Sequence, residues 1–278
     1  ITSTDIIKNY DNEQAAKDNK GRLLVGAAVG VRGDFMERVD ALVKAETDLI
    51  ILDIAHGHSD NELQAIAKIK SKYPNIELMG GNIATAKAAL DLIKAGIDSI
   101  KVGVGPGSTC TTRTTTGFGV PQLTAIMNIA SVCRKYDIPF NADGGIRKPA
   151  DFVKAIAAGA NTIMIGGQFS GTEETPGPLI TYQGRQYKIS RGMASLTAAL
   201  SRPDAKENFN QITPEGVEAR VPYRGPVQNI INQFMGGLRS GMSYGNARNL
   251  DELIKNTEFI RITNAGFRES DSHDNEVL

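Results

Sequence analysis

The sequence predicts an α/β fold built around a parallel sheet, and we favour a (β/α)8 TIM barrel over an open doubly wound sheet. Six apolar runs alternate with amphipathic stretches along the first two thirds of the chain. Nearly continuous apolar strands separated by helices indicate a sheet that is buried on both faces. Polar or glycine-rich signals follow five of the six runs. That placement is typical of a barrel, in which the carboxyl ends of all strands surround one active site.

The six runs are the expected strands, and the stretches between them are the expected helices. The strands are residues 23–29, 49–54, 76–82, 99–104, 139–145 and 162–167. Apolar residues recur at helical spacing over 61–73, 86–95 and 122–136, and Gly96 follows the second of these stretches as a stop signal. Six strands do not close an eight-stranded barrel, so the chain supplies about six βα units and two are supplied elsewhere.

The second half of the chain departs from this rhythm. Residues 181–224 are rich in Arg, Pro, Asn and Glu and predict a long insertion or mobile flap. Helical patterns return over 227–238 and 250–254, and 268–278 form a polar tail. We expect a catalytic barrel over 21–278 that includes the flap. The chain begins at Ile1 rather than Met, and we expect it to continue a longer polypeptide.

Composition limits the classes of partner. The chain has 278 residues, of which 41% are hydrophobic, and its 31 basic residues balance 31 acidic ones. This balance predicts no nucleic-acid or membrane partner and favours a small ligand. Two cysteines cannot form a disulfide framework, and no apolar run has the length of a secretory or membrane segment. We expect a cytoplasmic protein.

Glycine clusters at the last strand ends predict a phosphate site. Backbone without a Cβ can approach a phosphate closely, so the candidates are Ser108, Gly145, Gly166 and Gly167. The alternative is that these glycines only form tight βα turns. Asp143 ends an apolar strand, where its carboxylate requires a hydrogen-bonding partner such as a ribose diol, or it caps the next helix.

Cys110 is the clearest chemical signal in the sequence. It lies in a loop of glycine, serine and threonine, where a thiol contributes little to packing and is open to a substrate. We interpret Cys110 as a nucleophile and Cys133, in a helical stretch, as a packing residue. His56 and His58 lack a metal-ligand pattern, and Arg113, Arg191 and Arg239 are either phosphate ligands or solvated side chains.

These segments resemble the inosine monophosphate dehydrogenase and guanosine monophosphate reductase family. GPGSTCTTR (105–113) is similar to its catalytic loop, ADGGIR (142–147) and IGGQFSGTEE (165–174) to its phosphate segments, and RGMAS (191–195) to the segment beside the purine. The resemblance extends from about residue 21 to 270. It implies that Cys110 attacks C2 of a purine nucleotide and forms a covalent thioimidate.

The resemblance also implies roles for other residues and further parts of the protein. Thr112 and Glu174 would transfer the proton, and a nicotinamide cofactor would lie on Asp53, Ala55, Asn82 and Gly103. The nucleotide would contact Arg191, Gly192, Met193 and Glu215 besides the phosphate and ribose candidates named above. Backbone carbonyls of Gly105, Gly107 and Cys110 would hold a potassium ion. Residues 1–20 would form the exit from a regulatory insertion of the cystathionine-β-synthase (CBS) type, and the assembly would be a homotetramer or octamer.

The family catalyses two reactions, and the sequence favours the reductase, which uses NADPH to convert GMP to IMP and ammonia. Dehydrogenases resemble one another in an Arg-Tyr pair on the flap, and the corresponding residues 201–210 (SRPDAKENFN) contain none. The stretch TTTG (114–117) is also similar to reductases. The alternative is an NAD-dependent dehydrogenase that forms xanthosine monophosphate, which is favoured by PEGVE (214–218) and by Glu269, Ser270 and His273 near the end of the chain. A homologue without turnover also stays open.

Overall fold

The computed structural model describes residues 15–201 and 213–272. The expected regulatory exit at 1–20 therefore lies mostly outside the described residues. So do the flap residues that replace the Arg-Tyr pair, apart from Ser201, and His273 in the tail.

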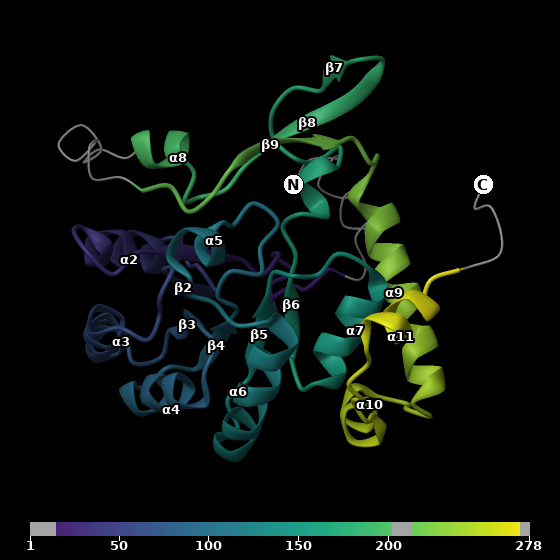
Figure 1. The fold of residues 1–278 in the computed structure, drawn as a ribbon. Helices are drawn as coiled ribbons and strands as arrows, with labels where there is room; N and C mark the ends of the chain where they lie inside the picture. Colours follow the sequence, from purple (N-terminus) through teal and green to yellow (C-terminus); the bar gives the residue numbers. More distant parts are fainter. Residues whose placement is uncertain (1–14, 202–212, 273–278) are drawn as a thin grey trace.

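The centre of the protein is a six-stranded parallel sheet, which confirms the expected α/β architecture of repeated βα units. Its strands follow one another in chain order and curl into part of a barrel (Figure 1). They are β1 (Gly26–Val29), β2 (Leu49–Asp53), β3 (Glu77–Ile83), β4 (Ser99–Val102), β5 (Phe140–Asp143) and β6 (Thr162–Met164). Because all six are parallel, their carboxyl ends meet at one edge of the sheet.

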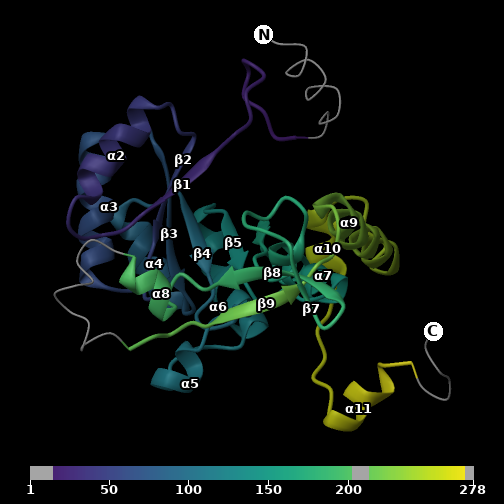
Figure 2. The ribbon, with the colours of Figure 1, turned by 90° about the horizontal axis from the view of Figure 1, so that it is seen from above.

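Helices cover the outer face of this curved sheet, as the view from above shows (Figure 2). They are α2 (Phe35–Lys44), α3 (Asp60–Lys72), α4 (Ala86–Ala95), α6 (Gln122–Tyr136) and α7 (Pro149–Ala157). Local sequence sets their ends: the hydroxyls of Ser59 and Thr85 cap α3 and α4, and Gly96 ends α4 in a left-handed conformation. Ile66, Leu92 and Ile126 on the inner helix faces are buried in the core. Each such side chain contributes about 1.5–3 kcal/mol by leaving water.

The first strand is shorter than the sequence predicts. Leu23, Leu24 and Val25 are 60%, 48% and 53% exposed and lie outside β1. Leu23 pairs with Lys17 in an isolated antiparallel bridge and Leu24 N donates to Ala16 O at 3.0 Å, so the chain before β1 folds back on itself. β1 and β6 are the two edges, and within residues 15–201 and 213–272 no other strand pairs with either.

The expected flap contains regular structure. Strands β7 (Ile180–Tyr182), β8 (Arg185–Arg191) and β9 (Glu218–Pro222) form an antiparallel ribbon, and α8 (Leu196–Leu200) follows β8. In Figure 1 the ribbon lies above the parallel sheet. The buried Lys188 ties it to the preceding loop, since its Nζ donates to Thr175 O at 2.8 Å and Gly177 O at 3.0 Å.

The remaining elements complete the described fold. They are α5 (Thr112–Thr116), the 3-10 turn η1 (Phe169–Gly171), α9 (Val227–Tyr244), α10 (Leu250–Asn256) and α11 (Asn264–Glu269). α9 and α10 pack on α7, and so extend the outer helical layer. None of the helices in the described parts of the chain combines the length and apolarity needed to cross a membrane.

A buried carboxyl joins the helical layer to the sheet. Glu62 of α3 is fully buried, and its Oε1 accepts a hydrogen bond from Gly81 N of β3 at 3.0 Å. Burial raises the pKa of Glu62 to about 8, against the opposing effect of the Gly81 hydrogen bond. The folded protein therefore holds a proton that the unfolded chain releases.

This carboxyl predicts a pH-dependent stability. A raised folded pKa stabilises the fold fully below the unfolded value of 4.5, and the contribution is lost as the pH rises to about 8. Between these values the free energy of unfolding should fall by up to about 1.4 kcal/mol per pH unit. Urea unfolding should show a shallower fall for Glu62→Gln than for wild type. The exposed Glu77→Gln is the control, and equal slopes for wild type and Glu62→Gln would refute the prediction.

Candidate active site

Cys110 lies in the loop that follows β4, at the carboxyl edge of the sheet. This half-buried thiol lies 3.2 Å from the hydroxyl of Thr112, the first residue of α5. Thr112 Oγ1 in turn donates to Glu215 Oε2 at 2.7 Å. The three side chains form a continuous path from a thiol to a carboxylate, along which a proton can move.

Backbone hydrogen bonds hold the flap against this loop. Thr111 N donates to Glu215 O at 2.8 Å, and Val217 N donates to Thr109 O at 2.9 Å. Cys110 and Gly216 pair between these bonds as an isolated antiparallel bridge. The segment before β9 thus pairs with the catalytic loop like a short strand, which brings Glu215 to Thr112.

Glu174, to which the resemblance gives a role in proton transfer together with Thr112, makes a different contact in this structure. Glu174 Oε2 instead accepts a hydrogen bond from Val227 N at 2.9 Å, at the start of α9, where an acidic group satisfies a free helix amide. The sequence reasoning took Glu215 for a nucleotide contact and missed its bond to Thr112. Residues 112 and 215 are 103 positions apart in the sequence, so no local sequence pattern predicts their contact.

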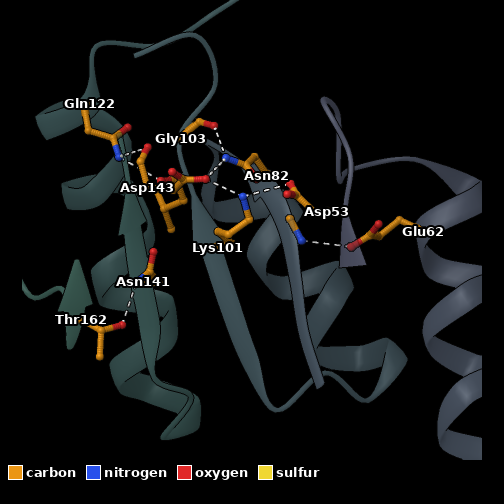
Figure 3. Close-up of polar contacts among 11 residues, drawn as sticks. Asp53, Glu62, Asn82, Lys101, Gly103, Gln122, Asn141, Asp143 and Thr162 are labelled. Carbon is orange, nitrogen blue, oxygen red and sulfur yellow. Dashed lines mark hydrogen bonds and ion pairs between the residues drawn. The ribbon is translucent and has the colours of Figure 1, made fainter. Parts of the chain in front are cut away.

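A buried lysine contacts acidic side chains at two other strand ends beside the loop (Figure 3). Lys101 of β4 has a side chain that is 3% exposed, and its Nζ lies 3.0 Å from Asp53 Oδ1 and in hydrogen-bond contact with Asp143 Oδ2. Asn82 Nδ2 also donates to Asp143 Oδ2, at 2.9 Å, and to Gly103 O, at 2.8 Å. Sequence reasoning missed Lys101, although a lysine inside an apolar strand was a usable signal, because a buried ammonium requires a charged partner.

This cluster brings the expected ribose and cofactor residues together. Asp143 was assigned to the nucleotide, whereas Asp53, Ala55, Asn82 and Gly103 were assigned to the cofactor. Asn82 Oδ1 is buried and, among the described residues, has no hydrogen-bond partner. Because this amide oxygen has no exposed surface, the Asp53 carboxylate, whose side chain is 48% exposed, is the acceptor of the cluster that is open to a ligand.

The phosphate candidates approach one another at the neighbouring strand ends. A Cβ added to Gly167 would lie 2.5 Å from Ser108 Oγ, and one added to Gly145 would lie 3.1 Å from Pro106 Cβ. The same construction at Gly166 meets nothing within 4 Å, so the space beside this glycine is open. Three backbone segments, the loops after β4, β5 and β6, therefore come together, and the first of them carries Cys110.

The expected purine segment also reaches the catalytic loop. Gly192 N donates to Val217 O at 3.0 Å, and a Cβ on Gly192 would lie 3.0 Å from Thr109 Oγ1. Met193 is 79% exposed. Arg191 ends β8, where it pairs with Glu218 of β9.

The two cysteines differ in their surroundings. Cys133 lies in the core on α6, where burial raises the pKa of its thiol to about 12. Its expected packing role is confirmed. Of the two, only Cys110 combines partial exposure with a hydroxyl and a carboxylate in series.

The described fold combines a curled parallel sheet of βα units with a cysteine loop that pairs with a flap segment, and comparison with known proteins specifies the family. The IMP dehydrogenase / GMP reductase domain matches residues 2–273. This chain belongs to that family.

Two relatives carry the name inosine-5'-monophosphate dehydrogenase. The protein from Aquifex aeolicus is 52% identical over 100% of this chain and 57% of its own length, and that from Nitrosopumilus maritimus is 50% identical over 99% and 59%. A solved structure of a GMP reductase from Trypanosoma brucei, in complex with guanosine 5'-monophosphate, has a TM-score of 0.92 and 46% identity. It matches 99% of this chain and 57% of that protein. The chain thus spans a little over half the length of the proteins it resembles.

Proposed function

We propose that this chain forms the catalytic part of a GMP reductase, which converts guanosine monophosphate to inosine monophosphate and ammonia with NADPH. The observation that carries the proposal is the Cys110, Thr112 and Glu215 path, together with a flap sequence (201–210) that lacks an Arg-Tyr pair. A proton relay serves the departure of ammonia, whereas hydrolysis of the adduct additionally requires an activated water.

In this proposal Cys110 Sγ bonds to C2 of the purine as a nucleophile. The C2–N bond then breaks, and the amino group leaves as ammonia after gaining a proton. That proton comes from the Cys110 thiol, which donates to Thr112 Oγ1. It passes through Thr112 to the Glu215 carboxylate as the Sγ–C2 bond forms, and it returns by the same path to the departing amino group. The Cys110–C2 bond breaks once C2 has been reduced, which releases the thiolate, and a proton from solvent restores the thiol.

The other residues bind and orient the reactants. Asp143 holds the ribose, and the region between Ser108, Gly145, Gly166 and Gly167 holds the 5′-phosphate through backbone amides. Arg191, Gly192 and Met193 line the purine side. Asp53, Ala55, Asn82 and Gly103 hold the nicotinamide cofactor, which supplies the hydride to C2. A potassium ion on the carbonyls of Gly105, Gly107 and Cys110, and a tetrameric or octameric assembly, stay predictions.

The second candidate is the NAD-dependent inosine monophosphate dehydrogenase. The names of the bacterial and archaeal relatives at about half identity favour it. Glu215 would then take a proton from water instead of giving one to ammonia, and the hydride would leave C2. Arg202 and Lys206, which lie outside the described residues, would be the first alternatives to test as a base.

The position of the proton relay predicts different effects of two glutamates. Glu215→Gln should lower kcat by about 10²–10⁴, because the amide keeps the contact with Thr112 but cannot hold an acidic proton. Glu174→Gln is the matched control and should retain most turnover, since it affects the α9 cap. Steady-state kinetics with direct nucleotide binding tests this, and equal losses of kcat would argue against the relay.

The open space at Gly166 provides a clean test of the phosphate region. Its backbone does not require glycine and a Cβ there meets no protein atom within 4 Å, so Gly166→Ala should fold normally. The added methyl should raise the KM for the nucleotide with little change in thermal unfolding. If the variant binds mononucleotide as wild type does, the phosphate does not lie at this glycine.

The direction of the reaction is measured by the absorbance of the reduced cofactor with full-length protein. We expect NADPH consumption and ammonia release with GMP, and little NADH formation from IMP and NAD. Steady NADH formation from IMP, without NADPH consumption on GMP, would reverse the choice and favour the dehydrogenase.

A further inference from the structure

The helix that carries Thr112 is too short to orient itself. α5 has five residues, and isolated helices of this length are not stable in water. Its orientation is therefore set by contacts with its surroundings. Glu215 contacts this helix through Thr112. Arg113, the residue after Thr112, makes further contacts.

Arg113 joins the two ends of the catalytic loop. Its Nη2 donates to Val104 O at 3.2 Å, just after β4, and to Val120 O at 2.5 Å, just before α6. Val120 N also donates to Val104 O, at 3.4 Å. One guanidinium thus bonds to both carbonyls where the loop begins and ends.

Two glycines make room for this side chain. A Cβ on Gly105 would lie 2.6 Å from Arg113 Cγ, and one on Gly119 would lie 2.5 Å from the same atom. Both glycines have positive φ, of 83° and 147°, which L side chains rarely adopt. The arginine stem therefore passes between two backbone segments that only glycine allows to come so close.

We infer that Arg113 is a positioning residue that sets the direction of the Thr112 hydroxyl. Neighbouring side chains on a helix point about 100° apart, so fixing Arg113 fixes the rotation of α5 about its axis. That rotation holds Thr112 Oγ1 between Cys110 Sγ and Glu215 Oε2. Nη2 alone makes both bonds, so the length of the arginine side chain matters here, and we expect the shorter lysine side chain not to bring its ammonium to both carbonyls.

The inference rests on the proposed role of Thr112, and its test separates the two. Arg113→Ala and Arg113→Lys are made in the full-length protein, with Arg134→Ala on the exposed face of α6 as control. Hydrogen exchange of the 103–120 segment needs no activity: both Arg113 variants should exchange faster here than wild type, and Arg134→Ala should not. Unchanged exchange in both variants would overturn the inference.

Kinetics then test whether Arg113 acts through Thr112. We expect kcat to fall by about 10² in Arg113→Ala, with a nearly unchanged KM for the nucleotide, and exogenous guanidinium to restore part of the rate. Combined with Thr112→Val, the substitution should cause no further loss beyond that of Thr112→Val alone. Additive losses, or wild-type kcat in Arg113→Lys, would overturn the positioning role. The cycle uses whichever nucleotide pair the protein converts, so a reversed direction leaves it intact. If the wild type converted neither nucleotide with its cofactor, the proposed function and the positioning role would both fail. Hydrogen exchange alone would then test whether Arg113 orders the loop.

Discussion

The site depends on the hydrogen bonds that join the flap to the catalytic loop at Glu215. Its backbone carbonyl accepts from Thr111 N and its carboxylate accepts from Thr112, so one residue fixes both the path of the loop and the hydroxyl beside Cys110. Cys110 follows a strand of the parallel sheet, whereas Glu215 precedes a strand of the antiparallel ribbon. The hydrogen-bonded path from Cys110 to Glu215 therefore requires that these two layers are docked.

A second constraint is the charge of Lys101. The buried ammonium of Lys101, on β4, contacts Asp53 of β2 and Asp143 of β5, so it links the ends of three strands. Removing it would leave the partly exposed carboxylates of Asp53 and Asp143 without their shared cation. The proposed cofactor and ribose subsites thus share one cation.

The sequence predicts most of the sheet because apolar strands and capped helices are local patterns. Gly96 marks a helix end that the structure reproduces. Leu23 to Val25 have the composition of a strand but lie exposed outside β1. An apolar run alone does not predict which of its residues pair with a neighbouring strand. The ribbon of β7 to β9 was expected only as a flap. Its polar and apolar residues alternate too weakly to predict strands.

The sequence alone singles out Cys110 as a candidate nucleophile, but not the residues that contact it. Cys110 is recognisable in the sequence because it lies among glycine, serine and threonine. Glu215, in contrast, comes into contact with Thr112 only through tertiary folding. Glu174 was the nearer acidic residue in a recognisable motif, and its bond to Val227 N shows that a motif does not specify the direction of a side chain. Arg113 was considered for a phosphate, but its guanidinium is engaged by two backbone carbonyls.

The most direct test of the account is to trap the covalent intermediate on the full-length protein. GMP would be mixed with the enzyme, the reaction quenched with acid and the peptides analysed by mass spectrometry. The account predicts a purine ribotide that has lost ammonia, attached to Cys110 and not to Cys133, which disappears when NADPH is added before the quench. Absence of a GMP-derived adduct, with an adduct on Cys110 from IMP and NAD, would contradict it.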